Sequence, residues 1–201
     1  MVRAHLWGLF ARPQAEWERI RQQRYSIGRV YLTHTLWLAL IPPIAGFIGT
    51  TQVGWQLGVG DPVKLTVESA LRIAVLYYIA LLIVAFSVGW MVHWMGKTYG
   101  ADQPLSQCVA LASYTATPLL LSGVMTLYPM LWLNLVIGIP VLGYTVYLFY
   151  TGVPIMMEIP QERGFLFSSA MVAFGLVALV ALLAVTAILW GMGFEPVIAN
   201  Y

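Results

Sequence analysis

Four long stretches of this chain contain no Asp, Glu, Lys or Arg, and they constrain the fold more than any other feature. They cover residues 30–60, 73–96, 103–157 and 164–194. A helix needs about 20 consecutive apolar residues to cross the hydrocarbon core of a bilayer. The chain is 60% hydrophobic and only 9% charged, whereas a soluble domain carries about 25% charged residues. The sequence therefore predicts an all-α protein that spans a membrane several times.

The run 103–157 is too long for one crossing, because at about 1.5 Å per residue it would be more than twice as long as the hydrocarbon core is thick. Tyr128-Pro129 is the best position for a turn within it, since proline disfavours helix at the preceding residue. We therefore predict five spanning helices, kinked at prolines. The predicted spans, within one domain of residues 30–191, are about 30–51, 73–96, 104–127, 130–153 and 166–190. The continuously apolar runs disfavour a β-barrel, whose strands alternate.

Basic residues are concentrated at the N-terminal end of the chain. Six of the ten Lys and Arg residues lie within residues 1–29. With five spans, this segment and the loops at 97–103 and 154–165 share one side of the membrane. Because basic loops stay in the cytoplasm, we predict a cytoplasmic N-terminus and a short outer tail at residues 192–201. The net charge of only +2 gives no global basic field for nucleic acid.

The basic segment has the pattern of a short helix that opens at Pro13. Trp17 and Ile20 would share one face of this helix, and three arginines, Arg19, Arg21 and Arg24, would surround it. One interpretation is a helix that lies on an anionic lipid surface. The other is a topology signal with some helical character. In both interpretations the lipid bilayer is the partner of this segment.

Proline residues mark the predicted kinks. Pro118 cannot donate a hydrogen bond to the carbonyl of Tyr114, and its ring clashes there. The side chains of Ser113, Thr115 or Thr117 are candidates to satisfy the freed backbone in lipid. This position is either a cavity or gate at mid-depth or a fixed bend that improves packing. Two further kinks are predicted in other spans, at Pro42-Pro43 and at Pro140.

Ionisable side chains within the spans are few, and such groups are functional candidates. His34, His93 and Cys108 fall at a similar predicted depth on the same side, and imidazole and thiolate are metal ligands. Their spacing matches no metal motif, so they are weak metal candidates beside a simple hydrogen-bonding role. We expect no cofactor. We also find no catalytic grouping of residues, so we expect that the protein is not an enzyme.

Several short motifs are distributed over the chain, namely His5-Leu-Trp-Gly-Leu-Phe10 with Arg12-Pro13, Phe47-Ile-Gly-Thr-Thr-Gln-Val-Gly-Trp55, Tyr114-Thr-Ala-Thr-Pro-Leu-Leu-Leu-Ser-Gly123, Leu127-Tyr-Pro129 and Ile188-Leu-Trp-Gly191. Together they resemble the Yip family, named for interaction with Ypt/Rab GTPases, and in particular its bacterial inner-membrane branch. The family's Gly-Tyr-x-x-x-Pro pattern occurs in this sequence at residues 113–118, with Ser113 in place of the glycine. The resemblance implies a five-span fold with a cytoplasmic N-terminus in the cell inner membrane. It implies no established activity for the bacterial branch.

Two functions remain as hypotheses. The first is a non-enzymatic membrane-organising or scaffold protein that forms homo-oligomers or contacts other membrane proteins. The second is a transporter, channel or lipid-moving protein with a cavity between kinked helices. A hydrated cavity lined by Tyr114, His34 or His93 would favour transport, whereas a tightly packed core with an exposed apolar groove would favour scaffolding.

Overall fold

The computed structural model describes residues 2–55 and 62–192, without the side chains of residues 2–4 and of several residues between 179 and 190. This part of the chain is mostly helical, and it contains an antiparallel bridge between Trp55 and Val63. Two short helices begin the chain, α1 (Val2–Ala11) and α2 (Pro13–Gln23). We refer to α1 and α2 together as the cap.

The longer helical stretches follow the cap. The first consists of α3 (Ile27–Val30), the π-helix η1 (Tyr31–Thr35), α4 (Leu36–Leu38), α5 (Ile41–Ile48) and the π-helix η2 (Gly49–Val53). The second consists of α6 (Val67–Gly96) and the 3₁₀ turn η3 (Lys97–Tyr99). The third contains α7 (Leu105–Thr115), α8 (Thr117–Ser122) and η4 (Gly123–Leu127). The last two helices are α9 (Leu131–Met157) and α10 (Gln161–Gly191).

Four of these stretches in the described residues are long and apolar enough to cross a membrane, namely Ile27–Val53, Val67–Tyr99, Leu105–Leu127 and Leu131–Met157. They confirm an all-helical protein with several membrane spans. The helix α10 covers the predicted fifth span 166–190, and its crossing stays a prediction. The predicted outer tail, beyond Met192, lies outside the described residues.

The three predicted proline kinks have different outcomes. The helix is interrupted before Pro118, between α7 and α8, and again before Pro42-Pro43, between α4 and α5. In contrast, α9 continues without a break past Pro140. A proline removes a single hydrogen bond, and membrane helices accommodate that loss where local adjustments satisfy the freed groups. The helix is therefore not interrupted at Pro140, and a kink there stays a prediction.

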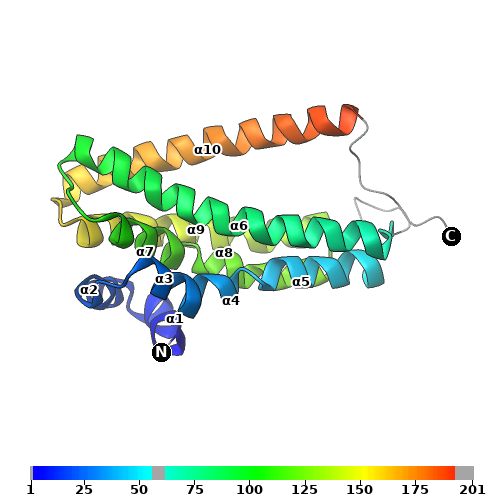
Figure 1. Cartoon of the computed structure of the whole chain (residues 1–201), viewed down its shortest axis with the longest axis horizontal. Coiled ribbons are helices and arrows are strands. Elements are labelled where there is room, and N and C mark those ends of the chain that lie inside the picture. Colours follow the sequence, from blue (N-terminus) through cyan, green and yellow to red (C-terminus); the bar gives the residue numbers. More distant parts are fainter. Residues whose placement is uncertain (1, 56–61, 193–201) are drawn as a thin grey trace.

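The third stretch lies at the centre of the molecule. In its most apolar window, 67% of the residues are buried inside the protein. The helix α6 packs closely along it, because a Cβ at Gly89 would lie 2.6 Å from the Cα of Val109. The cap lies beside one end of the elongated bundle (Figure 1). Figure 1 also shows α10 diverging from α6 towards the other end.

Candidate functional site

A π-helical turn positions the first residue of the site. The π-helix Tyr31–Thr35 interrupts the regular α-helix of the first stretch, and such bulges are frequent at functional sites. The turn contains His34, whose side chain is fully buried. Thr35 beside it is also buried, and its hydroxyl has no hydrogen-bond partner among the described residues. His34, which the sequence predicts within the first span, is therefore buried inside the protein.

The proline break in the third stretch faces this turn. The helix α7 ends at Thr115, where the N–H of Ala116 donates to the carbonyl of Ala112 at 3.1 Å. The next helix begins at Thr117, with Pro118 in its first turn, a position where the missing N–H of proline costs no helical bond. The break gives Thr117 an inward orientation, and its side chain is fully buried.

The turn and the break meet in a compact polar contact. Nε2 of His34 lies 3.0 Å from the hydroxyl oxygen of Thr117. The rings of His34 and Tyr114 are 4.3 Å apart between centroids and tilted by 42°. Tyr114 is only 3% exposed, and Ser113 next to it has a buried hydroxyl with no hydrogen-bond partner in the described part of the chain. The two strongest kink candidates, Tyr114 and Pro118, thus belong to one packed cluster.

The cap closes this cluster from the end of the bundle. The ring of His5 packs edge-on against Tyr114, with 5.7 Å between centroids. Nδ1 of His5 contacts the carboxylate of Glu16, and because a carboxylate only accepts, Nδ1 is the donor. Nε2 of His5 lies 3.3 Å from the hydroxyl of Tyr25, and the guanidinium of Arg29 lies 4.7 Å above the Tyr25 ring. A row of polar groups therefore runs from the surface to Thr117.

Glu16 is the feature of this cluster that the sequence did not indicate. Its side chain is nearly fully buried, although it belongs to the basic segment. A Cβ at Gly8 would lie 2.0 Å from its Oε2, so only glycine lets α1 approach the carboxylate this closely. Arg19 donates to the same oxygen at 3.3 Å. The signal available in the sequence was that Glu16 stands next to Trp17 and four residues before Ile20, on the apolar face.

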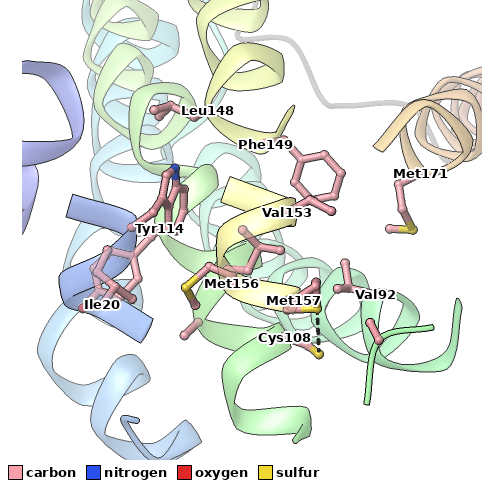
Figure 2. Packing of buried hydrophobic residues seen from close by; sticks show 14 of the residues in the cluster. Ile20, Val92, Cys108, Tyr114, Leu148, Phe149, Val153, Met156, Met157 and Met171 are labelled. Carbon is pink, nitrogen blue, oxygen red and sulfur yellow. Dashed lines mark hydrogen bonds between the residues drawn. The ribbon is translucent and has the colours of Figure 1, made fainter. Parts of the chain in front are cut away.

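The apolar face of α2 packs on the protein, which corrects the lipid-surface interpretation for Trp17. Its side chain is fully buried, and a Cβ at Gly152 of α9 would lie 2.7 Å from its indole. Figure 2 shows Ile20 of the same face near Tyr114. Among the arginines, Arg21 binds Glu158 at 3.3 Å, and Arg24 is exposed at the end of α2. Burial of the apolar face of α2 in a notch of the bundle stabilises the protein more than contact with the partly polar membrane surface would, because more apolar area is removed from water.

The three metal candidates lie in two different places. His34 contacts Thr117, whereas His93 donates from Nδ1 to the carbonyl of Gln103 at 2.9 Å. The thiol of Cys108 lies 3.9 Å from the same carbonyl and 3.9 Å from the sulfur of Met157 (Figure 2). Within residues 2–55 and 62–192, no three His, Cys, Asp or Glu side chains come together as metal ligands.

An apolar groove lies on the other side of the central helix. It has a volume of about 480 Å³ and lies between α6, α9 and α10. Its walls include Val88, Phe149 and Met171, and Figure 2 shows Met171 of α10 facing Phe149 and Val153 of α9. The hydroxyl of Thr115 is buried at this groove and has no hydrogen-bond partner in the described residues. We refer to this space as the lateral groove.

Comparison with known proteins gives consistent matches. The Yip1 domain model matches residues 7–182. The chain is 42% identical over 192 residues to the inner membrane protein YohC of Escherichia coli K12, covering 96% of this chain and 98% of that protein. The inner membrane protein YohC of Escherichia coli O6:H1 gives the same values. No solved structure matches the chain. With the family model over most of its length and relatives at this identity, the chain belongs to the Yip1 domain family of multi-pass membrane proteins.

Proposed function

We propose that this protein is a non-enzymatic membrane-organising scaffold that holds a helix of another membrane protein in the lateral groove. The observation that carries the proposal is the combination of a closed core with an open apolar groove. His34, Thr117 and Tyr114 pack against one another with at most 3% exposure. The cap covers the same cluster through His5. Because this core is closed, we expect a partner to bind at the outer surface of the bundle.

The walls of the lateral groove suit a helix of a partner protein. Ser87 of α6 and Gly175 and Ala178 of α10 line it, and small residues let the backbones of two membrane helices approach closely. A Cβ at Gly175 would meet nothing within 4 Å, so the space beside it is open. The groove is otherwise lined mainly by apolar side chains such as Val88, Phe149 and Met171, which suits the apolar face of a membrane helix.

Site-specific photo-crosslinking tests this proposal. A photoreactive residue is placed at Ser87 or at Ala178, on opposite walls, and the adducts formed in cells are identified by mass spectrometry. We expect both positions to capture the same peptide of one membrane protein. Gly175→Phe fills the groove and is expected to abolish both adducts. The matched control is Gly138→Phe on α9, where a Cβ also meets nothing within 4 Å but which lies outside the groove lining.

The outcomes of this experiment separate the candidate functions. Adducts with lipid alone, lost in Gly175→Phe, would replace the scaffold by a lipid-moving protein. Adducts that persist in Gly175→Phe would mean that the groove is not the contact surface. Different proteins captured from the two walls would also contradict a single helix between them.

The alternative, a transporter or channel, is favoured by one observation. The polar row from Tyr25 through His5, Tyr114 and His34 to Thr117 enters the span from one end, and rows of polar groups serve as proton relays in membrane proteins. Purified protein in vesicles that contain a pH-sensitive dye tests this function. Proton flux that is present in the wild type and lost in His34→Leu would support the alternative. The scaffold proposal predicts no flux in either protein.

The proposal also includes five crossings with the cap in the cytoplasm, because the arginines of the first 29 residues favour that side. Cys108, which is the only cysteine in the sequence, is buried, so labelling starts from Cys108→Ser. Cysteines introduced at Ser26 and at Met192, both exposed, are then treated with an impermeant reagent on intact cells. We expect labelling at position 192 alone. Labelling at both positions, or at position 26 alone, would contradict this topology.

A further inference from the structure

A second cavity lies at the cap end of the bundle and is unrelated to the lateral groove. It has a volume of about 1080 Å³ and lies between α2, the last turns of α9 and the first turns of α10. Because α9 ends at Met157 and α10 begins at Gln161, the cavity lies at the level where a span leaves the hydrocarbon core. This is the depth of lipid headgroups.

The polar side of this cavity carries two carboxylates from different elements. Glu18 of α2 and Glu162 of α10 both line it, and both are exposed. Neither carboxylate takes part in a salt bridge with a described residue, whereas Glu16 and Glu158 nearby bind Arg19 and Arg21. Two carboxylates without a cationic partner in one cavity favour a ligand that brings a positive charge.

The other side of the cavity is aromatic and apolar. Tyr147, Tyr150 and Phe165 line it, and the rings of Tyr150 and Phe165 are 5.4 Å apart between centroids. The hydroxyl of Tyr150 is fixed by Ser169 at 2.8 Å. Aromatic faces attract cations. Beyond the rings, Phe165 and Leu166 are 60% and 58% exposed on the outer surface of α10, so the cavity continues into an apolar surface.

A basic side chain stands beside the cavity. Arg12 lines an adjoining space of about 330 Å³, which shares Gln14 and Tyr147 with the main cavity. Its guanidinium makes no salt bridge with the residues that the structure describes. A guanidinium matches the geometry of a phosphate. The cavity and its adjoining space therefore combine two carboxylates, aromatic rings and a guanidinium with a neighbouring apolar surface.

We propose that this cavity binds a zwitterionic glycerophospholipid with a primary ammonium headgroup. Glu18 and Glu162 accept hydrogen bonds from the ammonium, Arg12 binds the phosphate, and the acyl chains run along Phe165 and Leu166. A quaternary ammonium has no N–H to donate to the two carboxylates. The headgroup of phosphatidylglycerol is an uncharged glycerol and brings no positive charge to them. The proposal does not depend on the partner in the lateral groove.

Binding of three synthetic lipids with identical acyl chains tests the site. Phosphatidylethanolamine, phosphatidylcholine and phosphatidylglycerol are added to the purified full chain in detergent, and the bound lipid is quantified by native mass spectrometry. We expect the wild type to bind phosphatidylethanolamine about tenfold more tightly than the other two, the factor given by one charge-assisted hydrogen bond. Equal binding of the three lipids would overturn the proposal.

Substitutions then assign the preference to this cavity. The double variant Glu18→Gln with Glu162→Gln is expected to lose the tenfold preference, and Arg12→Gln is expected to weaken all three lipids alike. The matched control is Glu68→Gln at the start of α6, where an exposed carboxylate pairs with Arg72, and it is expected to keep the preference. A double variant that still prefers phosphatidylethanolamine would contradict the site, as would a loss of the preference in Glu68→Gln.

Discussion

Of the second and third helical stretches of this protein, the more hydrophobic one is the less buried one. The stretch Val67–Tyr99 is the more hydrophobic of the two, yet only 6% of its most apolar window is buried inside the protein. For Leu105–Leu127 the buried share is 67%. The most apolar helix therefore faces lipid, and the less apolar one forms the centre.

The physical reason lies in what each helix contacts. Lipid tails are as apolar as leucine, so an apolar face loses nothing by staying outside. Polar groups in a span face the interior of the bundle, where they find partners. In the third stretch, Gln107 donates to the carbonyl of Met156 at 2.7 Å, and the hydroxyl of Thr117 lies 3.0 Å from Nε2 of His34. For a chain of this kind, moderate polarity within a span therefore marks the centre of the bundle.

The largest expected effect comes from adding the same side chain to both helices. Ala112 of α7 is 5% exposed, and Ala80 of α6 is exposed. We expect Ala112→Phe to lower the free energy of unfolding by about 3 kcal/mol, because overpacking a filled core displaces its neighbours. Ala80→Phe is expected to change it by less than about 0.5 kcal/mol, as for other surface substitutions.

Reversible unfolding of the purified protein in mixed micelles measures both values. Two variants with equal loss would break the comparison, because α6 would then be packed as tightly as α7 in the membrane. A second protein copy covering α6 would have this effect, and it would disappear on dilution.

A smaller effect is expected at the junction of the cap and the central helix. Glu16→Gln keeps the size of the side chain but removes the charge that His5 and Arg19 bind. We expect a loss of about 2 kcal/mol, the range for a buried hydrogen bond to a charged group. The matched variant Glu68→Gln breaks an exposed pair with Arg72 and is expected to cost less than about 0.5 kcal/mol.

Limited proteolysis gives an independent measurement of the same junction. Trypsin is expected to cleave the Glu16→Gln variant within the cap faster than the wild type, because the cap separates from the bundle more often. If cleavage of the cap were equally fast in both proteins, the contact between His5 and Glu16 would not hold the cap in place.

The helices and the multi-pass character were predictable because they follow from chain-wide properties. Uncharged runs locate apolar helices, and the interruption before Pro118 follows from a missing N–H and a steric clash. At Pro140 the helix α9 is not interrupted, since the rule describes a local loss and not the strength of the surrounding helix. Whether a proline interrupts a membrane helix depends on the neighbours that satisfy the freed carbonyl.

The contents of the candidate site were only partly predictable for a related reason. Tyr114, His34 and Thr117 were each candidates, but their contact depends on the π-helical turn at Tyr31–Thr35, which has no sequence signature in this chain. A lipid surface was one of the two interpretations for Trp17, because arginines surround its face of the helix. The notch beside Gly152 that receives it is formed by a helix more than a hundred residues away, and that pairing is a property of the tertiary fold.

The smallest effect tests the contact between the π-helical turn and the proline break. His34→Phe keeps a ring against Tyr114 but removes the hydrogen bond to Thr117, so we expect a loss of about 1 kcal/mol in the free energy of unfolding. A double-mutant cycle with Thr117→Val isolates this bond, and its coupling energy is expected to be about 1 kcal/mol.

The matched cycle uses Thr145→Val, because the hydroxyl of Thr145 donates within its own helix to Val141. Its coupling to His34 is expected to be close to zero. Equal coupling energies in the two cycles would mean that His34 stabilises the central helix by packing alone. The contact between His34 and Thr117 would then not help to explain why the third stretch, and not α6, lies at the centre.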